Sequence, residues 1–175
     1  MSLARRIAAW GAVALAFGVV LVFALPSYRQ GEASVAGKTA ENFDMELQGK
    51  PTKLSDLRGK VVVLNFWFAS CPPCIEEAPS LNKLQEHIES RGGTVLGVSV
   101  DEERGPYEKF LKDHSVNFPT WRDPSKKVAS EYGTAIFPDT YIIGRDGKIL
   151  RKIMGPQDWS SPEMLAYLDA ILKQS

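Results

Sequence analysis

The stretch that organises this chain runs from Val61 to Cys74 and reads VVVLNFWFASCPPC. It begins with an apolar run over 61–68, rich in β-branched and aromatic side chains, which predicts a buried central strand of a parallel sheet. Beyond Cys74, apolar residues recur at helical spacing until Arg91-Gly92-Gly93, which predicts a helix that stops there. The apolar positions of this helix are Ala78, Leu81, Leu84 and Ile88.

Cys71 and Cys74 are the two cysteines of the chain, and two residues separate them. Thiols at this spacing can close into a small disulfide ring and open again. A pair placed between a buried strand and a helix start is typical of redox sites. The alternatives are an inert structural pair or half of a zinc site, but no third or fourth cysteine is present to complete a metal site.

The start of a helix favours a thiolate at Cys71, because the first turn carries unpaired N–H groups and the positive end of the helix dipole. We therefore expect Cys71 to be the attacking nucleophile and Cys74 to be the resolving thiol. Pro72 and Pro73 lack N–H groups, so two donors that would stabilise the thiolate are missing. This favours a reductase over an oxidase, although one nearby charge would reverse the preference.

Residues 7–25 form an uncharged stretch that follows Arg5 and Arg6. At about 1.5 Å per residue it nearly spans a bilayer, which predicts a membrane anchor within residues 1–25 and an exported remainder. A cleaved signal sequence is the alternative, although its apolar core is usually about 7–15 residues long. Both alternatives place the cysteines in an oxidising compartment, where a reductase must be kept reduced.

The composition excludes some partners and limits the number of domains. Lysine plus arginine equal aspartate plus glutamate at 21 each, and no basic patch indicates nucleic acid. Residues 26–40 are small and polar and are interpreted as a linker. Residues 41–175 suffice for one domain with a core and are too few for two.

Turn and periodicity signals divide residues 41–175 into short elements. Strand–helix–strand units followed by a hairpin and a terminal helix predict a mixed α/β sheet flanked by helices. Strands are expected at 42–47, near 53–54, and at 94–100, 117–121, 139–143 and 148–154, with hairpin turns at 48–51 and 144–147. Helical segments are expected at 55–57, 106–112, 125–132 and from 161 to about 173.

These residues resemble a known family. The sequence of residues 64–67 and the Cys-Pro-Pro-Cys motif are similar to the active-site block of the thioredoxin superfamily. Glu77, Pro79 and residues 137–148 are similar to its TlpA/ResA-like branch, whose members are membrane-anchored thiol-disulfide oxidoreductases of the bacterial cell envelope. The resemblance covers nearly all of residues 41–175. It implies a thioredoxin-like α/β fold with an N-terminal β-hairpin and a central insertion at 104–121, preceded by one transmembrane helix.

The resemblance also implies a function. Members of this branch reduce apocytochrome c before haem attachment or serve copper-protein assembly. We expect a reductase of client disulfides on the periplasmic side of the membrane, supplied by a membrane thiol electron donor. No cofactor is expected besides the Cys71–Cys74 disulfide.

Two other activities are considered against this expectation. A copper-delivery protein would need soft ligands around one ion, and the pair lacks an obvious third ligand, although His114, Met45 or Met154 could approach it. A peroxide-reducing relative would need a peroxidatic cysteine in a threonine-containing loop well before a second cysteine, and the sequence has none there. His87 and His114 are otherwise interpreted as surface residues.

The resemblance gives Glu77 a role in proton transfer. Cytoplasmic thioredoxins keep a buried aspartate where this chain has Asn65, which cannot accept a proton. Glu77 lies one helical turn after Cys74 and is the candidate carrier of the Cys74 proton, with its pKa raised by partial burial. The alternative is a solvated helix residue like Glu76, in which case water or Asp101 would carry the proton.

Four residues are expected to bind the client. Pro138 matches the cis-proline of the superfamily, which implies that it packs opposite the cysteines and exposes the backbone of Phe137 to an extended client strand. Trp67 is expected to form the floor or rim of the cleft, although a plain core aromatic is the alternative. Pro72, within the motif, is the fourth.

Three further positions bear on the site. Pro79 matches the helix-kinking proline. Ser70 stands where the family usually has tryptophan, which would open the rim of the cleft. Asp139 stands where threonine is common, and a negative charge there would raise the pKa of Cys71.

Overall fold

The computed structural model describes residues 35–173 of the chain. The predicted anchor or signal sequence at 1–25 and most of the predicted linker at 26–40 lie outside the described residues. Within residues 35–173, none of the helices has the length and apolar character needed to cross a bilayer.

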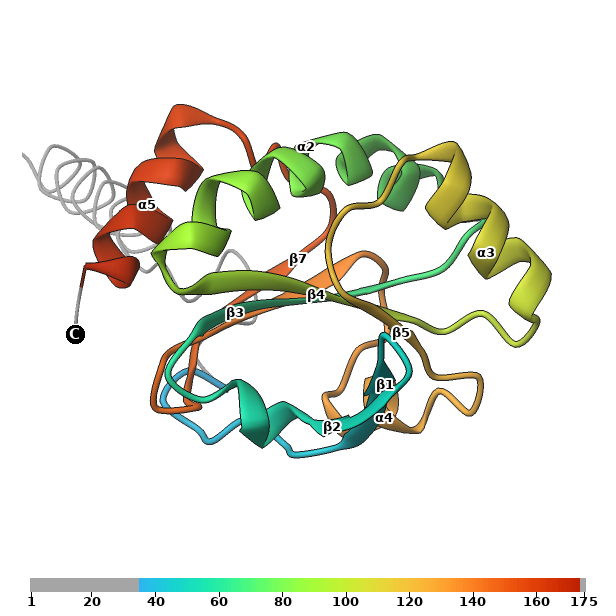
Figure 1. Ribbon diagram of the computed structural model, residues 1–175, viewed down its shortest axis with the longest axis horizontal. Helices are drawn as coiled ribbons and strands as arrows, with labels where there is room; N and C mark the ends of the chain where they lie inside the picture. Colours follow the sequence, from blue (N-terminus) through green and yellow to red (C-terminus); the bar gives the residue numbers. More distant parts are fainter. Residues whose placement is uncertain (1–34, 174–175) are drawn as a thin grey trace, which may run out of the picture. The chain divides into compact units, whose positions relative to one another are not determined.

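A five-stranded mixed sheet forms the centre of the domain (Figure 1). Strand β3 (Val61–Trp67) is the middle strand and is buried along its whole length, as its apolar run requires. On one side of β3, β4 (Gly93–Ser99) and β5 (Thr120–Arg122) continue the sheet in parallel. On the other side, β6 (Asp139–Ile143) and β7 (Ile149–Met154) continue it in antiparallel order. The predicted mixed α/β sheet is therefore confirmed.

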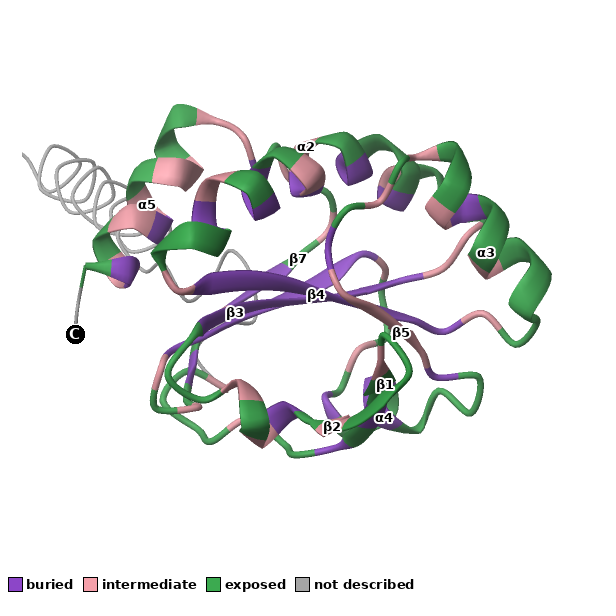
Figure 2. Cartoon of the chain, viewed as in Figure 1, coloured by how far each residue is buried: buried purple, intermediate pink, exposed green. Residues whose placement is uncertain are grey.

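Helices cover one face of this sheet (Figure 1). The cysteine helix α2 (Pro72–Ile88), which continues into the turn η4 (Glu89–Arg91), lies there with α3 (Arg104–Asp113) and the terminal helix α5 (Pro162–Leu172). The buried side chains of α2 and α5 pack with Val61 and Val63 on β3, whereas Phe110 of α3 packs with Trp67 at the end of that strand. Figure 2 shows the consequence, since the central strands β3 and β4 are buried while the outer sides of the helices are exposed.

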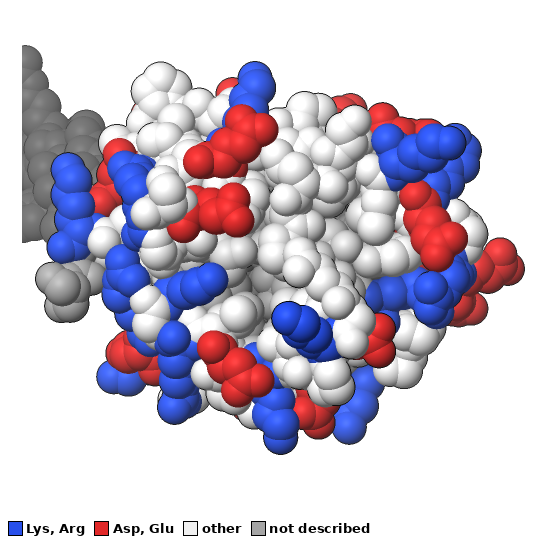
Figure 3. Space-filling view, viewed as in Figure 1, with Lys and Arg blue, Asp and Glu red and all other residues white. Residues whose placement is uncertain are grey.

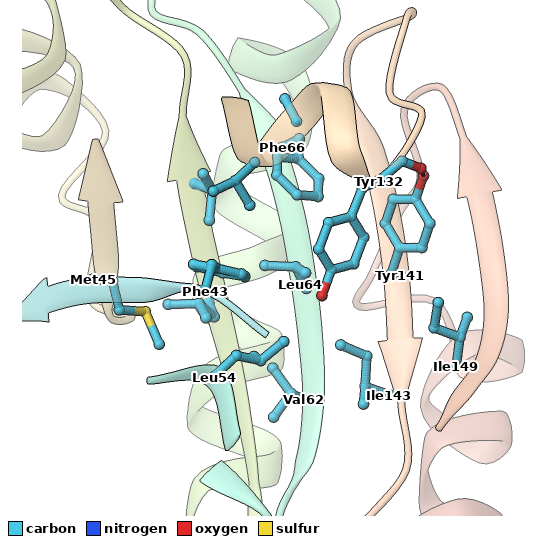
Figure 4. Packing of buried hydrophobic residues seen from close by; sticks show 14 of the residues in the cluster. Phe43, Met45, Leu54, Val62, Leu64, Phe66, Tyr132, Tyr141, Ile143 and Ile149 are labelled. Carbon is cyan, nitrogen blue, oxygen red and sulfur yellow. Dashed lines mark hydrogen bonds between the residues drawn. The ribbon is translucent and has the colours of Figure 1, made fainter. Parts of the chain in front are cut away.

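The opposite face of the sheet is covered by the N-terminal hairpin, the turn η3 (Leu54–Leu57) and the short helix α4 (Lys127–Glu131). Alternate β3 residues, Val62, Leu64 and Phe66, point to this face. They pack against side chains such as Phe43, Tyr132 and Tyr141 (Figure 4).

The N-terminal hairpin is tighter than predicted. Its strands are β1 (Asp44–Leu47) and β2 (Lys50–Lys53), so the turn contains only Gln48 and Gly49 rather than residues 48–51. Both turn residues have positive φ, 52° and 75°, which matches a two-residue turn whose twist follows that of the strands.

The surface charge is mixed, as the composition predicts. On the face drawn in Figure 3, basic and acidic side chains are interspersed around uncharged areas. Several exposed pairs of opposite charge contribute to this pattern, among them Lys109 with Asp113 and Lys126 with Glu102.

Candidate active site

Cys71 and Cys74 form a disulfide at the start of α2, with their Cα atoms 5.2 Å apart. Cys71 is the N-cap residue, and Pro72 and Pro73 occupy the first turn without offering N–H donors. The amide of Cys74 donates to the Cys71 sulfur at 3.3 Å. Within residues 35–173 it is the one backbone donor to this sulfur, so the proline pair leaves a single main-chain contact to stabilise a thiolate.

The disulfide lies in an apolar cluster. Both cysteines are buried, each 2% exposed, and pack with Trp67 and Phe110. The ring of Trp67 lies 4.1 Å from that of Phe110 and 5.9 Å from that of Tyr107, centroid to centroid, so the inserted helix α3 forms one wall of the site. Trp67 is 3% exposed, which places it beneath the disulfide and not at the rim.

Glu77, three residues after Cys74 on α2, is buried, with 2% of its surface exposed. The Asn65 side-chain amide donates to Oε1 at 2.8 Å, and the Trp159 indole N–H and the Gln157 amide donate to Oε2 at 3.1 and 3.3 Å. Burial raises the pKa of Glu77 to about 7, and these hydrogen bonds only partly offset the effect. The solvated alternative is therefore wrong for Glu77, whereas Glu76 next to it is exposed. The proton-carrying role of Glu77 stays a prediction.

Asn65 connects this carboxyl group to the sheet. Besides its bond to Glu77, its amide donates to the Thr140 hydroxyl at 2.9 Å, so it bridges α2 and β6. Sequence reasoning missed Thr140 and Trp159 as members of this network. Trp159 is 82 residues away from Glu77 along the chain, and no local pattern could indicate the contact.

The Phe137–Pro138 peptide bond is cis, as the resemblance implies. Phe137 belongs to the apolar cluster around the disulfide, where its ring meets that of Phe68 edge-on at 5.4 Å. The structure thus brings Phe137, Trp67 and both cysteines together. Pro72 is exposed on the first turn of α2.

Two exposed apolar side chains flank the site and were not predicted. Ile75 follows the motif and is 37% exposed, and Ile136 precedes Phe137 and is 62% exposed. Their neighbours in the sequence, Cys74 and Phe137, are cluster members. Ser70 is exposed as well, in agreement with an open rim.

The expectation for Asp139 is wrong. Its carboxylate is 1% exposed and forms an ion pair with Lys152 at 2.9 Å, so its charge is compensated. Asp139 also pairs in register with Phe66, which faces the hairpin side of the sheet and not the α2 side. It therefore adds no free negative charge beside Cys71.

Asp101, the reserve candidate for carrying the Cys74 proton, is engaged elsewhere. Its carboxylate accepts the Ala69 amide at 3.0 Å and the Ser99 hydroxyl at 2.7 Å. These bonds hold the loop that leads from β3 to Cys71, which is a structural task.

The residues considered as copper ligands are dispersed. Met45 lies in the core on the hairpin face, Met154 is exposed on β7, and the His114 ring packs on Phe110 at 4.5 Å. Within residues 35–173, no three His, Cys, Asp or Glu side chains gather as they do around a metal ion. His87 is half-buried, and its Nε2 lies 2.8 Å from Oδ1 of Asp169, a contact that links α2 to α5.

The fold and the cysteine pair define a class, the thiol-disulfide oxidoreductases with a thioredoxin-like fold. The model of the AhpC/TSA family matches residues 36–152, and the chain belongs to this family.

Named relatives agree with this class. The thiol-disulfide oxidoreductase ResA of a Bacillus cereus strain is 35% identical over 136 residues, which are 77% of this chain and 78% of the relative. ResA of Bacillus subtilis is 36% identical over 127 residues, 71% of each chain. The crystal structure of a Chlorobium tepidum protein assigned as the thiol:disulfide interchange protein DsbE superimposes with a TM-score of 0.74 at 30% identity, covering 79% of this chain and 99% of that one.

Proposed function

We propose that this oxidoreductase reduces disulfides of client proteins in the bacterial cell envelope, as in cytochrome c maturation. The observation that carries the proposal is the buried carboxyl group of Glu77, which has a pKa of about 7 and lies one helical turn beyond Cys74. A group of this kind can take and return a proton near neutral pH.

The proposed reaction has two exchange steps. The Cys71 thiolate attacks one sulfur of the client disulfide, which forms a mixed disulfide and releases the other client sulfur as a thiolate. Cys74 then loses its proton to Glu77 and attacks the Cys71 sulfur, which closes the ring and releases the second client thiolate. Two electrons pass from the protein to the client, and the client thiolates take up protons.

The environment of Cys74 explains why a base is needed. A buried apolar cluster disfavours a thiolate, so the proton of Cys74 needs a nearby acceptor. Moving a proton from an ordinary thiol, of pKa about 8.5, to a carboxylate of pKa about 7 costs about 2 kcal/mol. The same transfer to an ordinary glutamate would cost about 6 kcal/mol. Burial of Glu77 thus removes most of the cost.

Client binding is proposed for the segment that precedes the cis-proline. An extended client strand would pair with the backbone of Phe137 and bring its disulfide to Cys71. The exposed side chains of Ile75 and Ile136 support this, because they offer apolar surface next to Cys74 and Phe137 in the sequence. Pro72 would contribute to the same surface.

The location and the electron supply are part of the proposal. Residues 7–25 would anchor the protein in the cytoplasmic membrane with the catalytic domain outside, and a membrane thiol protein would return electrons to the disulfide.

The direction of the reaction is tested by trapping thiols in cells. Cells that express the full-length protein are quenched with acid, and free thiols are alkylated. A reductase is expected mainly as the dithiol, and the purified protein is expected to have a reduction potential below about −200 mV. A protein found fully oxidised in cells, with a reduction potential of about −120 mV, would instead be an oxidase.

A further inference from the structure

The start of β6 holds a buried ion pair that the proposed reaction does not use. Asp139 is 1% exposed, and the side chain of Lys152 on β7 is 10% exposed. The Lys152 ammonium lies 2.9 Å from the Asp139 carboxylate and 4.9 Å from the centre of the Tyr141 ring. Removing two charges from water is costly, so a buried ion pair adds little net stability compared with apolar side chains in the same place.

The partners of this pair are concentrated on one short segment. The same Asp139 oxygen accepts the Thr134 hydroxyl at 2.9 Å and lies 3.3 Å from the Tyr141 hydroxyl oxygen. The Lys152 ammonium donates to the carbonyl of Gly133 at 3.3 Å.

Tyr141 extends this network by one more residue. Its hydroxyl donates to the carbonyl of Tyr132 at 2.5 Å, and the two rings lie side by side (Figure 4). Three consecutive residues, 132–134, are thus fixed by Asp139, Lys152 and Tyr141.

This segment leads directly to the cis-proline. The bond from Thr134 to Asp139 closes a loop whose intervening residues are Ala135, Ile136, Phe137 and Pro138. No backbone hydrogen bond within the described residues holds positions 135–137 themselves. The backbone of these residues is therefore held by the two tied ends of the loop, together with the packing of the Phe137 ring on Phe68.

We propose that Asp139 and Lys152 form a positioning pair that fixes the loop over 134–139 and so presents the backbone of Phe137 to protein clients. This inference rests on the proposed client-binding role of Phe137. The pair touches neither the sulfurs nor the Glu77 network, and it acts through the loop alone. Its effect should depend on the size of the disulfide substrate.

The test compares two substrates with the full-length protein in detergent. Insulin is a protein disulfide that must lie along the loop, whereas hydroxyethyl disulfide needs access to Cys71 only. The double variant Asp139→Asn, Lys152→Met removes both charges and leaves none unpaired. We expect its kcat/KM for insulin, relative to that for hydroxyethyl disulfide, to fall about tenfold, mainly through a higher KM.

Two further variants separate positioning from folding. Thr134→Val removes only the hydroxyl that closes the loop and should shift the same ratio in the same direction by a smaller factor. Lys152→Arg keeps the charge, so its ratio of kcat/KM for insulin to that for hydroxyethyl disulfide should equal the ratio of the parent. The matched control is Lys148→Met. Lys148 pairs with Asp146 in the turn between β6 and β7, where both side chains are exposed, so the substrate ratio of this variant should equal that of the parent.

A second measurement distinguishes the two proposals. Backbone order parameters of residues 135–137 should fall in the double variant from about 0.85 towards 0.6 or less. Unchanged order parameters, or equal losses with both substrates, would overturn the positioning role. Lower order parameters with an unchanged substrate ratio would support the positioning and overturn the client-binding role of Phe137.

Discussion

Glu77 and Asp139 are both buried carboxyl groups, yet they lie on opposite faces of the sheet and have different partners. In the part of the chain that the structure describes, the donors to Glu77 are neutral, namely an amide side chain, an indole and a backbone amide. Asp139 has the cation of Lys152 at 2.9 Å. The comparison shows that the partner, more than burial, decides what a buried carboxyl group can do.

Burial raises the pKa of both groups. Among residues 35–173 no cation compensates a negative charge on Glu77, and its pKa reaches about 7, where a proton can be exchanged. For Asp139 the bonds from Lys152 and Thr134 act against the effect of burial. Burial alone would lower the pKa of Lys152, but its hydrogen bonds with Tyr141 and Asp139 raise it. The α2 face thus holds a titrating group, and the hairpin face holds a fixed ion pair.

The largest expected effect on activity comes from replacing the cysteines, which lie on the α2 face of the sheet together with Glu77. Cys71→Ser should lower the rate of insulin reduction by about a thousandfold or more, because the nucleophile is lost. Cys74→Ser should instead accumulate mixed disulfides, because no resolving thiol is present. Reduction assays and non-reducing gels measure the two outcomes.

A variant of the same assay tests whether Glu77 acts on Cys74, as the comparison of the two carboxyl groups assumes. In the Cys74→Ser background, Glu77→Gln should have no effect on the first attack, since Glu77 is expected to act on Cys74 only. If Cys74 alkylates faster than Cys71 in the reduced parent, Cys74 is the nucleophile and Cys71 the resolving thiol. Glu77 would then not be the proton acceptor of the resolving thiol.

The next largest effect is expected on the hairpin face. Lys152→Met leaves Asp139 buried without its cation, so the free energy of unfolding at pH 7 should fall by about 3–5 kcal/mol. The loss should shrink as the pH falls, because protonation removes the unpaired charge of Asp139. Urea unfolding at several pH values measures this.

Lys148→Met provides the control, since its ion pair with Asp146 is more than half exposed on both sides. That change should leave the free energy of unfolding almost unchanged, because exposed ion pairs contribute little. Equal losses in the two variants would show that the buried and the exposed pair do not differ, contrary to the comparison.

These two faces also differ in how far the sequence could predict them. The apolar run 61–68 and the helical pattern after Cys74 predict β3 and α2, because a strand or helix is encoded by the period of its own residues. The cap at Ser161 follows from the same local logic, and its hydroxyl accepts the amide of Met164 as expected of an N-cap. Glu77 could be singled out only through the family resemblance.

The sequence could not predict which residues contact the carboxyl groups of Glu77 and Asp139. Trp159 meets Glu77 through the packing of the loop before α5, and Lys152 meets Asp139 through the register of β6 and β7. Such pairs depend on tertiary structure, and neither residue carries a local signal. The error about Asp139 has this origin, because its neighbour Pro138 suggested proximity to the sulfur while the strand pleat turns its side chain to the other face.

A smaller effect on stability is expected at Glu77 itself. Its folded pKa of about 7 lies above the ordinary value of 4.5, so its stabilising contribution is fully present below pH 4.5 and is lost as the pH rises through 7. The parent should therefore lose about 3 kcal/mol from this group between these limits, as an upper estimate. Glu77→Gln should lack this decline and be the more stable protein at pH 8. Urea unfolding of the oxidised proteins measures it, and Glu76→Gln should keep the decline of the parent.

The smallest expected effect is the one that bears most directly on mechanism. Glu77→Gln keeps the shape and most hydrogen bonds but cannot accept the Cys74 proton, so insulin reduction should slow by about tenfold near neutral pH. The parent rate should change with an apparent pKa near 7, and this step should be absent in the variant. Glu76→Gln is the matched control, because Glu76 is the adjacent residue of the same type and is exposed. A solvated carboxylate is screened from a buried sulfur, so that variant should follow the parent profile. Identical pH–rate profiles for all three proteins would leave Glu77 as a buried structural residue, and water would become the carrier to test, since Asp101 is bonded to Ala69 and Ser99.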